Sequence, residues 1–191
     1  MENFVRLFVT LTVVLCAFFP NVEAYDQKQF NLVKEGHGYY YVQFDLSNAD
    51  FSNFKLRGAN FTAANLQGAN LHGAELVGVS LRAAILQNAN LSAACLIAAD
   101  LRNADLNKAN LKGADLSNAD LSKANLKGAD LSNANLSHAK LNKTILNECN
   151  LSKANLNGTD LSGSSLGKDN RQEFQELQEN HIWLKTVNKL L

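Results

Sequence analysis

A five-residue period runs through most of this chain and constrains the fold more than any other feature. Every fifth residue from Phe51 to Leu166 is leucine or phenylalanine, and no insertion or deletion interrupts the series. A strand alternates with period two, and five residues of a helix advance by about 140° around its axis. Neither structure can keep these side chains on one face, but a chain that turns a corner once in each unit can.

Four units then make one coil of about 20 residues, in which the leucines point to the axis and successive coils stack at strand spacing. The residue two before each leucine also faces inward and is small almost throughout. It is mostly alanine, but Thr144, Cys149 and Thr159 occupy it late in the series. The pattern predicts an all-β solenoid of about six coils over residues 44–167.

The residue two after each leucine is expected to form the corner. It is often Gly or Asn, as at Gly58 and Asn88, which suits the positive φ of the third residue in a type II turn. Ala83, Ala93 and Lys123 lack this preference. They predict a type I or irregular turn on their sides.

The unit Ala114-Asp115-Leu116-Ser117-Asn118 shows a recurring A-(D/N)-L-x-x motif, and by this motif the chain resembles the pentapeptide-repeat proteins. The resemblance implies a right-handed quadrilateral β-helix over about two-thirds of the chain. Known members include DNA-mimicking gyrase protectors and many exported proteins of unknown role. The resemblance is therefore specific for fold and unspecific for function.

Residues 1–24 have the layout of a secretory signal peptide, with an apolar run, Pro20 and a cleavage site between Ala24 and Tyr25. The apolar run is too short to span a bilayer, so no stable membrane anchor is expected after cleavage. An uncleaved anchor is the alternative. The layout predicts an exported protein, either periplasmic or secreted.

Other elements are expected to cover the two ends of the solenoid. Residues 25–43 would lead into the first coil and cap it, and the phenylalanines of that region predict an aromatic plug, with an aromatic binding site as the alternative; they are Phe44, Phe51, Phe54 and Phe61. Residues 168–191 predict a C-terminal α-helix with one apolar face. This helix would cap the last coil or join two copies as a homodimer.

No residue set in the sequence indicates catalysis. The histidines have no partner at metal-ligand spacing, and no histidine is expected beside a repeat serine on a neighbouring coil. There is no phosphate loop and no dinucleotide fingerprint. We therefore expect no enzymatic activity, no catalytic residues, no metal and no cofactor.

The charge pattern argues against nucleic acid as a partner. Net charge is zero, with 18 basic and 18 acidic residues, so the protein has no general attraction for phosphate. On the outer surface Asp100 should stack on Asp120, with Arg82 and Arg102 on the same side offsetting the repulsion.

One outer patch departs from the polar rule. Val77 should stack on Ile97, with Cys95 on the same side, and we predict this patch as a protein contact. Cys95 and Cys149 should lie too far apart for a disulfide. The sequence thus favours an exported, non-enzymatic rigid module that binds or scaffolds an unidentified protein. The alternative is a DNA-mimicking, gyrase-interacting protein, which the neutral charge and the leader disfavour.

Overall fold

The computed structural model describes residues 41–165. The expected signal peptide with its Ala24–Tyr25 cleavage site, the lead-in up to residue 40 and the expected helix over residues 168–191 lie outside the described residues. Within residues 41–165 there is no helix and no strand longer than a single bridge residue. None of the described residues forms a helix of the length and apolarity that a membrane crossing requires.

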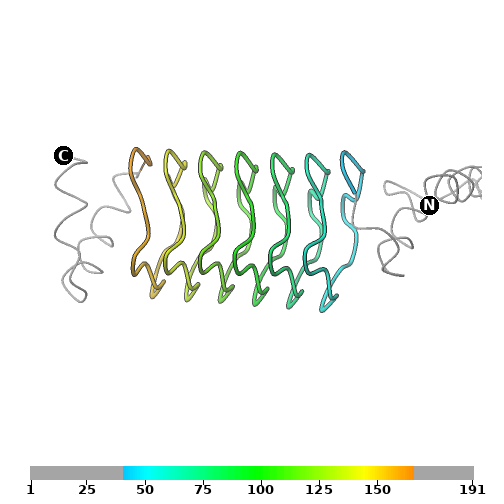
Figure 1. Cartoon of the computed structure of the whole chain (residues 1–191), viewed down its shortest axis with the longest axis horizontal. Helices are drawn as coiled ribbons and strands as arrows, with labels where there is room; N and C mark the ends of the chain where they lie inside the picture. Colours follow the sequence, from blue (N-terminus) through cyan, green and yellow to red (C-terminus); the bar gives the residue numbers. More distant parts are fainter. Residues whose placement is uncertain (1–40, 166–191) are drawn as a thin grey trace, which may run out of the picture.

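The described chain winds into stacked coils (Figure 1). Asp45 forms a parallel bridge with Asn65, Asn65 with Ile85, and Ile85 with Asp105. Hydrogen-bonded residues on neighbouring coils, such as Asn65 and Asp45, are 20 residues apart in the sequence. Because a bridge residue recurs every fifth position, each coil has four sides, as the period predicts. The ladder already includes Tyr41, whose N–H donates to the Asn60 carbonyl.

The leucines and the small residues fill the interior of the solenoid. Leu106 and Leu126 are fully buried, as are the alanines beside them. Thr144 and Thr159 are buried at small positions, and their hydroxyls donate to the carbonyls of Leu121 and Leu136, both at 2.8 Å. The inward hydroxyls therefore have acceptors, and they do not break the core.

Aromatic rings close the described N-terminal end, as the sequence predicts. Phe51 and Phe61 are buried, and their ring centroids lie 6.1 Å apart in an edge-on arrangement. Tyr41 stacks on Phe61 at 4.9 Å. Phe44 and Phe54 are partly buried against this cluster, which fills the width of the first coil with large side chains.

All corner positions have a positive φ, so the prediction of different turns at Ala83, Ala93 and Lys123 was wrong. Their φ angles are 53°, 56° and 62°, in the region that favours glycine. Each corner is closed by a bond from the small residue to the leucine carbonyl, as from Ala84 N–H to Leu81 at 3.1 Å. Coil stacking therefore sets the turn, and the unfavourable φ is tolerated.

Replacing Ala83 by glycine is expected to raise the free energy of unfolding by up to about 1.5 kcal/mol. Alanine at positive φ costs about 1–2 kcal/mol, and the added chain entropy of glycine offsets roughly 0.5–1 kcal/mol of that gain. The control is Ala84→Gly, at a buried position without positive φ, where the same change should destabilise. Urea unfolding of both variants checks this, and stabilisation by Ala84→Gly instead would contradict the turn assignment.

Each unit has five backbone N–H groups, and the unit Ala64–Gly68 shows where they go. Ala64 donates within its own turn, Asn65 to the preceding coil, and Leu66 and Gly68 to the following coil. The remaining N–H, that of Gln67, donates to the side-chain oxygen of Asn65 at 3.2 Å. We call the residue before each leucine the acceptor position because its side chain receives this fifth N–H.

The same side-chain bond forms wherever Asp or Asn occupies the acceptor position within residues 41–165. The acceptor side chain lies on the outer surface, so the N–H that it receives also points outward. Several of these side chains bond along the axis as well, as from Asn110 Nδ2 to Asn90 Oδ1 at 3.2 Å. The Asp or Asn of the motif is therefore the partner of an outward backbone donor.

Candidate protein-contact surface

One side of the solenoid lacks Asp and Asn at the acceptor position on three successive coils. Lys55, Glu75 and Cys95 stand there instead, and parallel bridges join Lys55 to Glu75 and Glu75 to Cys95. The N–H groups that would otherwise be received are those of Arg57, Val77 and Ile97. Within residues 41–165 none of these three makes a hydrogen bond. We call these three groups the donor row.

Other interruptions of the pattern are mostly isolated. Ser80, Ile85 and Lys140 each lie between an Asp or Asn on both neighbouring coils. Ile145 is followed on the next coil by Ser165, where the described residues end. Among residues 41–165 the donor row is thus the longest run of open N–H groups on one side.

The predicted contact residues Val77, Cys95 and Ile97 lie on this same side. All three are half-buried, and the Gly78 N–H donates to the Ile97 carbonyl at 2.9 Å, which fixes the coils of Val77 and Ile97 next to each other. Hydrophobicity alone indicated this patch. The open N–H groups were missed because the function of the acceptor position was not recognised. The sequence does indicate them, since positions 55, 75 and 95 lack the Asp or Asn that is usual there.

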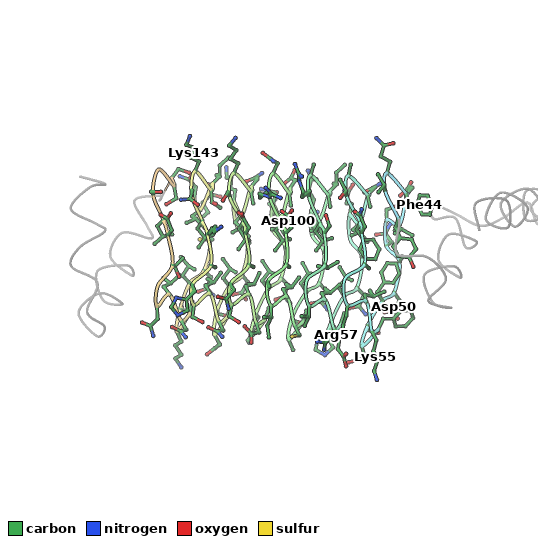
Figure 2. All side chains as sticks on the ribbon, in the orientation of Figure 1. Phe44, Asp50, Lys55, Arg57, Asp100 and Lys143 are labelled. Atoms are coloured by element: carbon green, nitrogen blue, oxygen red, sulfur yellow. The ribbon has the colours of Figure 1, made fainter. Side chains whose placement is uncertain are left out.

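Charged side chains lie at the N-terminal end of this side. Lys55 and Arg57 are exposed, and Figure 2 shows them close together near the first coils. Glu75 is half-buried on the next coil. Within residues 41–165 no salt bridge involves Lys55, Arg57 or Glu75. Their charges are therefore available to a partner.

A second side carries charges that neutralise one another. Asp100 stacks on Asp120 as predicted, and Arg102 lies 2.5 Å from Asp100 and 4.0 Å from Asp120. Arg82 approaches Asp100 at 3.9 Å. Partial burial pushes the pKa of Asp100 upward, but hydrogen bonds from Arg102 and the two guanidinium charges hold it below its usual value. The two carboxylates and the two guanidinium groups therefore compensate one another and together present little net charge.

Two isoleucines outside the contact side are more exposed than Val77, Cys95 and Ile97. Ile85 is 40% exposed and Ile145 43%, and both occupy acceptor positions on the side of Leu86. They are three coils apart, with Asp105 and Asn125 between them. Two separated apolar residues are normal on a protein surface and do not make a patch.

A histidine does lie beside a repeat serine, contrary to the sequence-based expectation. His72 and Ser92 occupy equivalent places on neighbouring coils, with His72 Nδ1 2.8 Å from Ser92 Oγ. The Ser92 hydroxyl also bonds Asn90 Oδ1 at 2.8 Å, as the Ser152 hydroxyl bonds Asn150 Oδ1 at 2.7 Å. The serine orientation is therefore that of the repeat, and the pair lies on the outer surface.

The other titratable groups offer no metal site in the part of the chain that the structure describes. No three His, Cys, Asp or Glu side chains within residues 41–165 are placed to share an ion. Cys95 is half-buried and Cys149 is 3% exposed, and the two are not joined by a disulfide.

Thiol labelling of the native protein should distinguish these two cysteines. Cys95, on the outer surface, is expected to react within the time that a free thiol takes, whereas Cys149 should react only after denaturation. Mass spectrometry of labelled peptides, with and without denaturant, measures both. Equal labelling of the two in the native state would contradict the inward placement of Cys149.

The family model described as pentapeptide repeats matches the chain in eight copies, over residues 45–82, 74–113, 84–122, 94–133 and 129–167. No curated protein matches this chain. Among solved structures, a pentapeptide repeat protein of the Arabidopsis thaliana thylakoid lumen is 32% identical, covering 58% of this chain and 77% of its own with a TM-score of 0.44.

Two other solved structures are also similar. HetL, a pentapeptide repeat protein involved in heterocyst differentiation regulation in Nostoc, is 34% identical over 65% of this chain and 70% of its own, with a TM-score of 0.28. QnrB1, a plasmid-mediated fluoroquinolone resistance protein, is 20% identical over 69% of this chain and 84% of its own, with a TM-score of 0.38.

Proposed function

The chain belongs to the pentapeptide-repeat family, whose fold is a right-handed quadrilateral β-helix, and from this premise we propose that it is an exported, non-enzymatic module that binds a protein partner. The contact surface is the side that carries the donor row, with Val77, Cys95 and Ile97. Solenoids of stacked repeats offer long rigid surfaces of this kind to their partners.

The observation that carries this proposal is the interruption of the acceptor pattern on three successive coils. The repeat supplies an acceptor for this outward N–H wherever Asp or Asn stands before the leucine, so the three groups of the donor row are left open to water or to a partner. Asp or Asn at positions 55, 75 and 95 would satisfy these groups at no cost to the core, because the acceptor side chains lie outside it. Such a departure from a local rule is typical of a functional surface.

Charge and chemistry favour a protein as the partner. Basic and acidic residues nearly balance across the repeat, and Lys55, Glu75 and Arg57 supply both signs on the contact side. Nucleic-acid binding by phosphate contacts would call for a basic stripe, and duplex mimicry for an acidic one.

The leader-like residues 1–24 support export, and N-terminal sequencing of the exported protein should find Tyr25 first.

Affinity capture from the exported fraction of the native host tests the contact side. The wild-type protein and the double variant Val77→Asn/Ile97→Asn serve as baits, with Ile85→Asn as a control that changes an exposed isoleucine on another side. We expect a partner that is retained by the wild type and by Ile85→Asn but lost from the double variant. A partner held equally by all three baits would place the contact elsewhere.

A further inference from the structure

We infer that the contact side takes an acidic segment of its partner, in which a carboxylate lies next to an aliphatic side chain. This inference rests on the proposed function and names the chemistry of the partner at the same surface. The carboxylate would accept hydrogen bonds from two neighbouring N–H groups of the donor row. The aliphatic side chain would cover Val77 and Ile97.

The open backbone groups of the donor row are N–H donors, and on the same side the corner carbonyls of Gly78 and Ala98 also receive no hydrogen bond within residues 41–165. The carbonyls of Glu75 and Cys95 accept from Leu56 and Leu76, and those of Val77 and Ile97 accept from Gly58 and Gly78, in the ladder between coils. A ligand that pairs with the donor row itself must therefore supply acceptors. An outward row of N–H groups is also an electropositive feature, which favours an anion over a neutral acceptor.

The spacing of the donor row selects a carboxylate over a bound strand. Successive N–H groups are one coil apart, which is about 4.8 Å. Carbonyls on one edge of an extended peptide recur every second residue, about 6.6–6.8 Å apart, so they cannot follow the row. The two oxygens of one carboxylate can each accept a hydrogen bond from one of two adjacent N–H groups. In the repeat itself, each Asp or Asn side chain accepts one such N–H.

Val77 is the central member of the donor row. Any carboxylate that bridges two adjacent donors, either Arg57 with Val77 or Val77 with Ile97, must use the Val77 N–H. The exposed Arg57 and Lys55 add positive charge at one end of the row, and Glu75 adds one negative charge beside its centre. The three side chains together carry a net positive charge, which complements an acidic segment.

The apolar part of the surface favours an aliphatic neighbour for that carboxylate. Val77 and Ile97 are half-buried on adjacent coils, and Ala98 is exposed next to Ile97. Ser117 follows on the next coil, and its N–H is already received by Asp115 at 3.0 Å. The donor row and the apolar surface therefore end at the same coil, which limits the site to about three coils along the axis, or roughly 10 Å between the first and last donors.

Selection from a random dodecapeptide library displayed on phage tests this partner chemistry. The purified protein is the target, and the library is first depleted on the Val77→Asn/Ile97→Asn variant. We expect the enriched peptides to carry Asp or Glu next to Leu, Ile or Val. Calorimetry with a synthetic peptide of the enriched sequence then measures binding to single variants.

Two substitutions at position 75 form the decisive pair. Both Glu75→Asn and Glu75→Gln remove the same negative charge, which by itself should strengthen binding of an acidic peptide. Asn also supplies the short side-chain acceptor that the repeat uses, so it should occupy the Val77 N–H and weaken binding by about tenfold. Glu75→Gln should bind at least as tightly as the wild type.

The remaining variants separate charge and stability from the donor effect. Arg57→Gln should weaken binding about tenfold through loss of the guanidinium. Ile85→Asn supplies the same kind of acceptor to Gln87 on another side and should leave binding unchanged. Thermal unfolding should place Glu75→Asn at or above the wild type, because an open donor gains a partner.

Several outcomes would overturn the inference: enrichment of peptides without carboxylates, no enrichment at all, or equal binding by Glu75→Asn and Glu75→Gln. The capture experiment with the native host keeps these outcomes distinct from failure of the proposed function. A host partner lost from the Val77→Asn/Ile97→Asn bait, together with peptides that ignore Glu75→Asn, would leave the contact side correct and the acidic chemistry wrong.

Discussion

Leu126→Ala is expected to lower the free energy of unfolding by about 2–5 kcal/mol. The Leu126 side chain is fully buried on the solenoid axis, and Leu106 and Leu146 stack on it from the neighbouring coils. Both coils are held by the backbone ladder and cannot close around the cavity that the substitution leaves. Chemical denaturation with a two-state fit measures the change.

Ser117→Ala is the matched control, because it also removes side-chain atoms from a repeat position but on the outer surface. Its backbone N–H keeps its bond to Asp115, so the change should stay within about 0.5 kcal/mol. Similar losses for the two variants would contradict the assignment of leucines to the interior.

Asn110→Ala should have the second largest effect, a loss of about 1–3 kcal/mol. The Asn110 side chain accepts the Lys112 N–H at 3.1 Å and donates to Asn90 at 3.2 Å, so truncation removes two hydrogen bonds and leaves the Lys112 N–H without an acceptor in the protein. Lys112→Ala serves as the control, since it changes the adjacent exposed side chain and keeps both bonds. A loss no greater than that of Lys112→Ala would show that the acceptor position contributes little to the fold.

The period alone was enough to predict the coil, its four sides and the residues of the core. A repeat of fixed length without insertions leaves little freedom, because each leucine must reach the same axis. The aromatic residues at the N-terminal end and the opposite charges around Asp100 followed from the same 20-residue stacking. The family resemblance drawn from the motif is confirmed over residues 45–167.

The corner at Lys123 was predicted wrongly because local preference was given too much weight. Lysine disfavours positive φ in isolation, but a coil bonded above and below leaves its corner no other conformation. The contact of His72 with Ser92 was missed for a related reason. Only a comparison of residues 20 apart shows it, and their separation in the sequence gives no local motif.

The predicted contact residues Val77, Cys95 and Ile97 were found through hydrophobicity, whereas the donors beside them were not. Hydrophobic patterns report side chains, and the open groups on this side belong to the backbone. They become visible only when every N–H of a unit is assigned a partner, as for the unit Ala64–Gly68. Lys55, Glu75 and Cys95 are then recognised as the residues whose side chains do not accept the N–H two positions further along the chain.

Amide hydrogen exchange, followed residue by residue by NMR, tests the open donor row most directly. Val77 and Ile97 should exchange fast, whereas the Ser117 amide, one coil further on the same side and bonded to Asp115, should be protected. Gly78 and Ala98, which donate to the next coil, supply the fully protected reference on the same side. Protection of Val77 and Ile97 equal to that of Ser117 would show that these N–H groups already have partners and would contradict the contact surface proposed for this side.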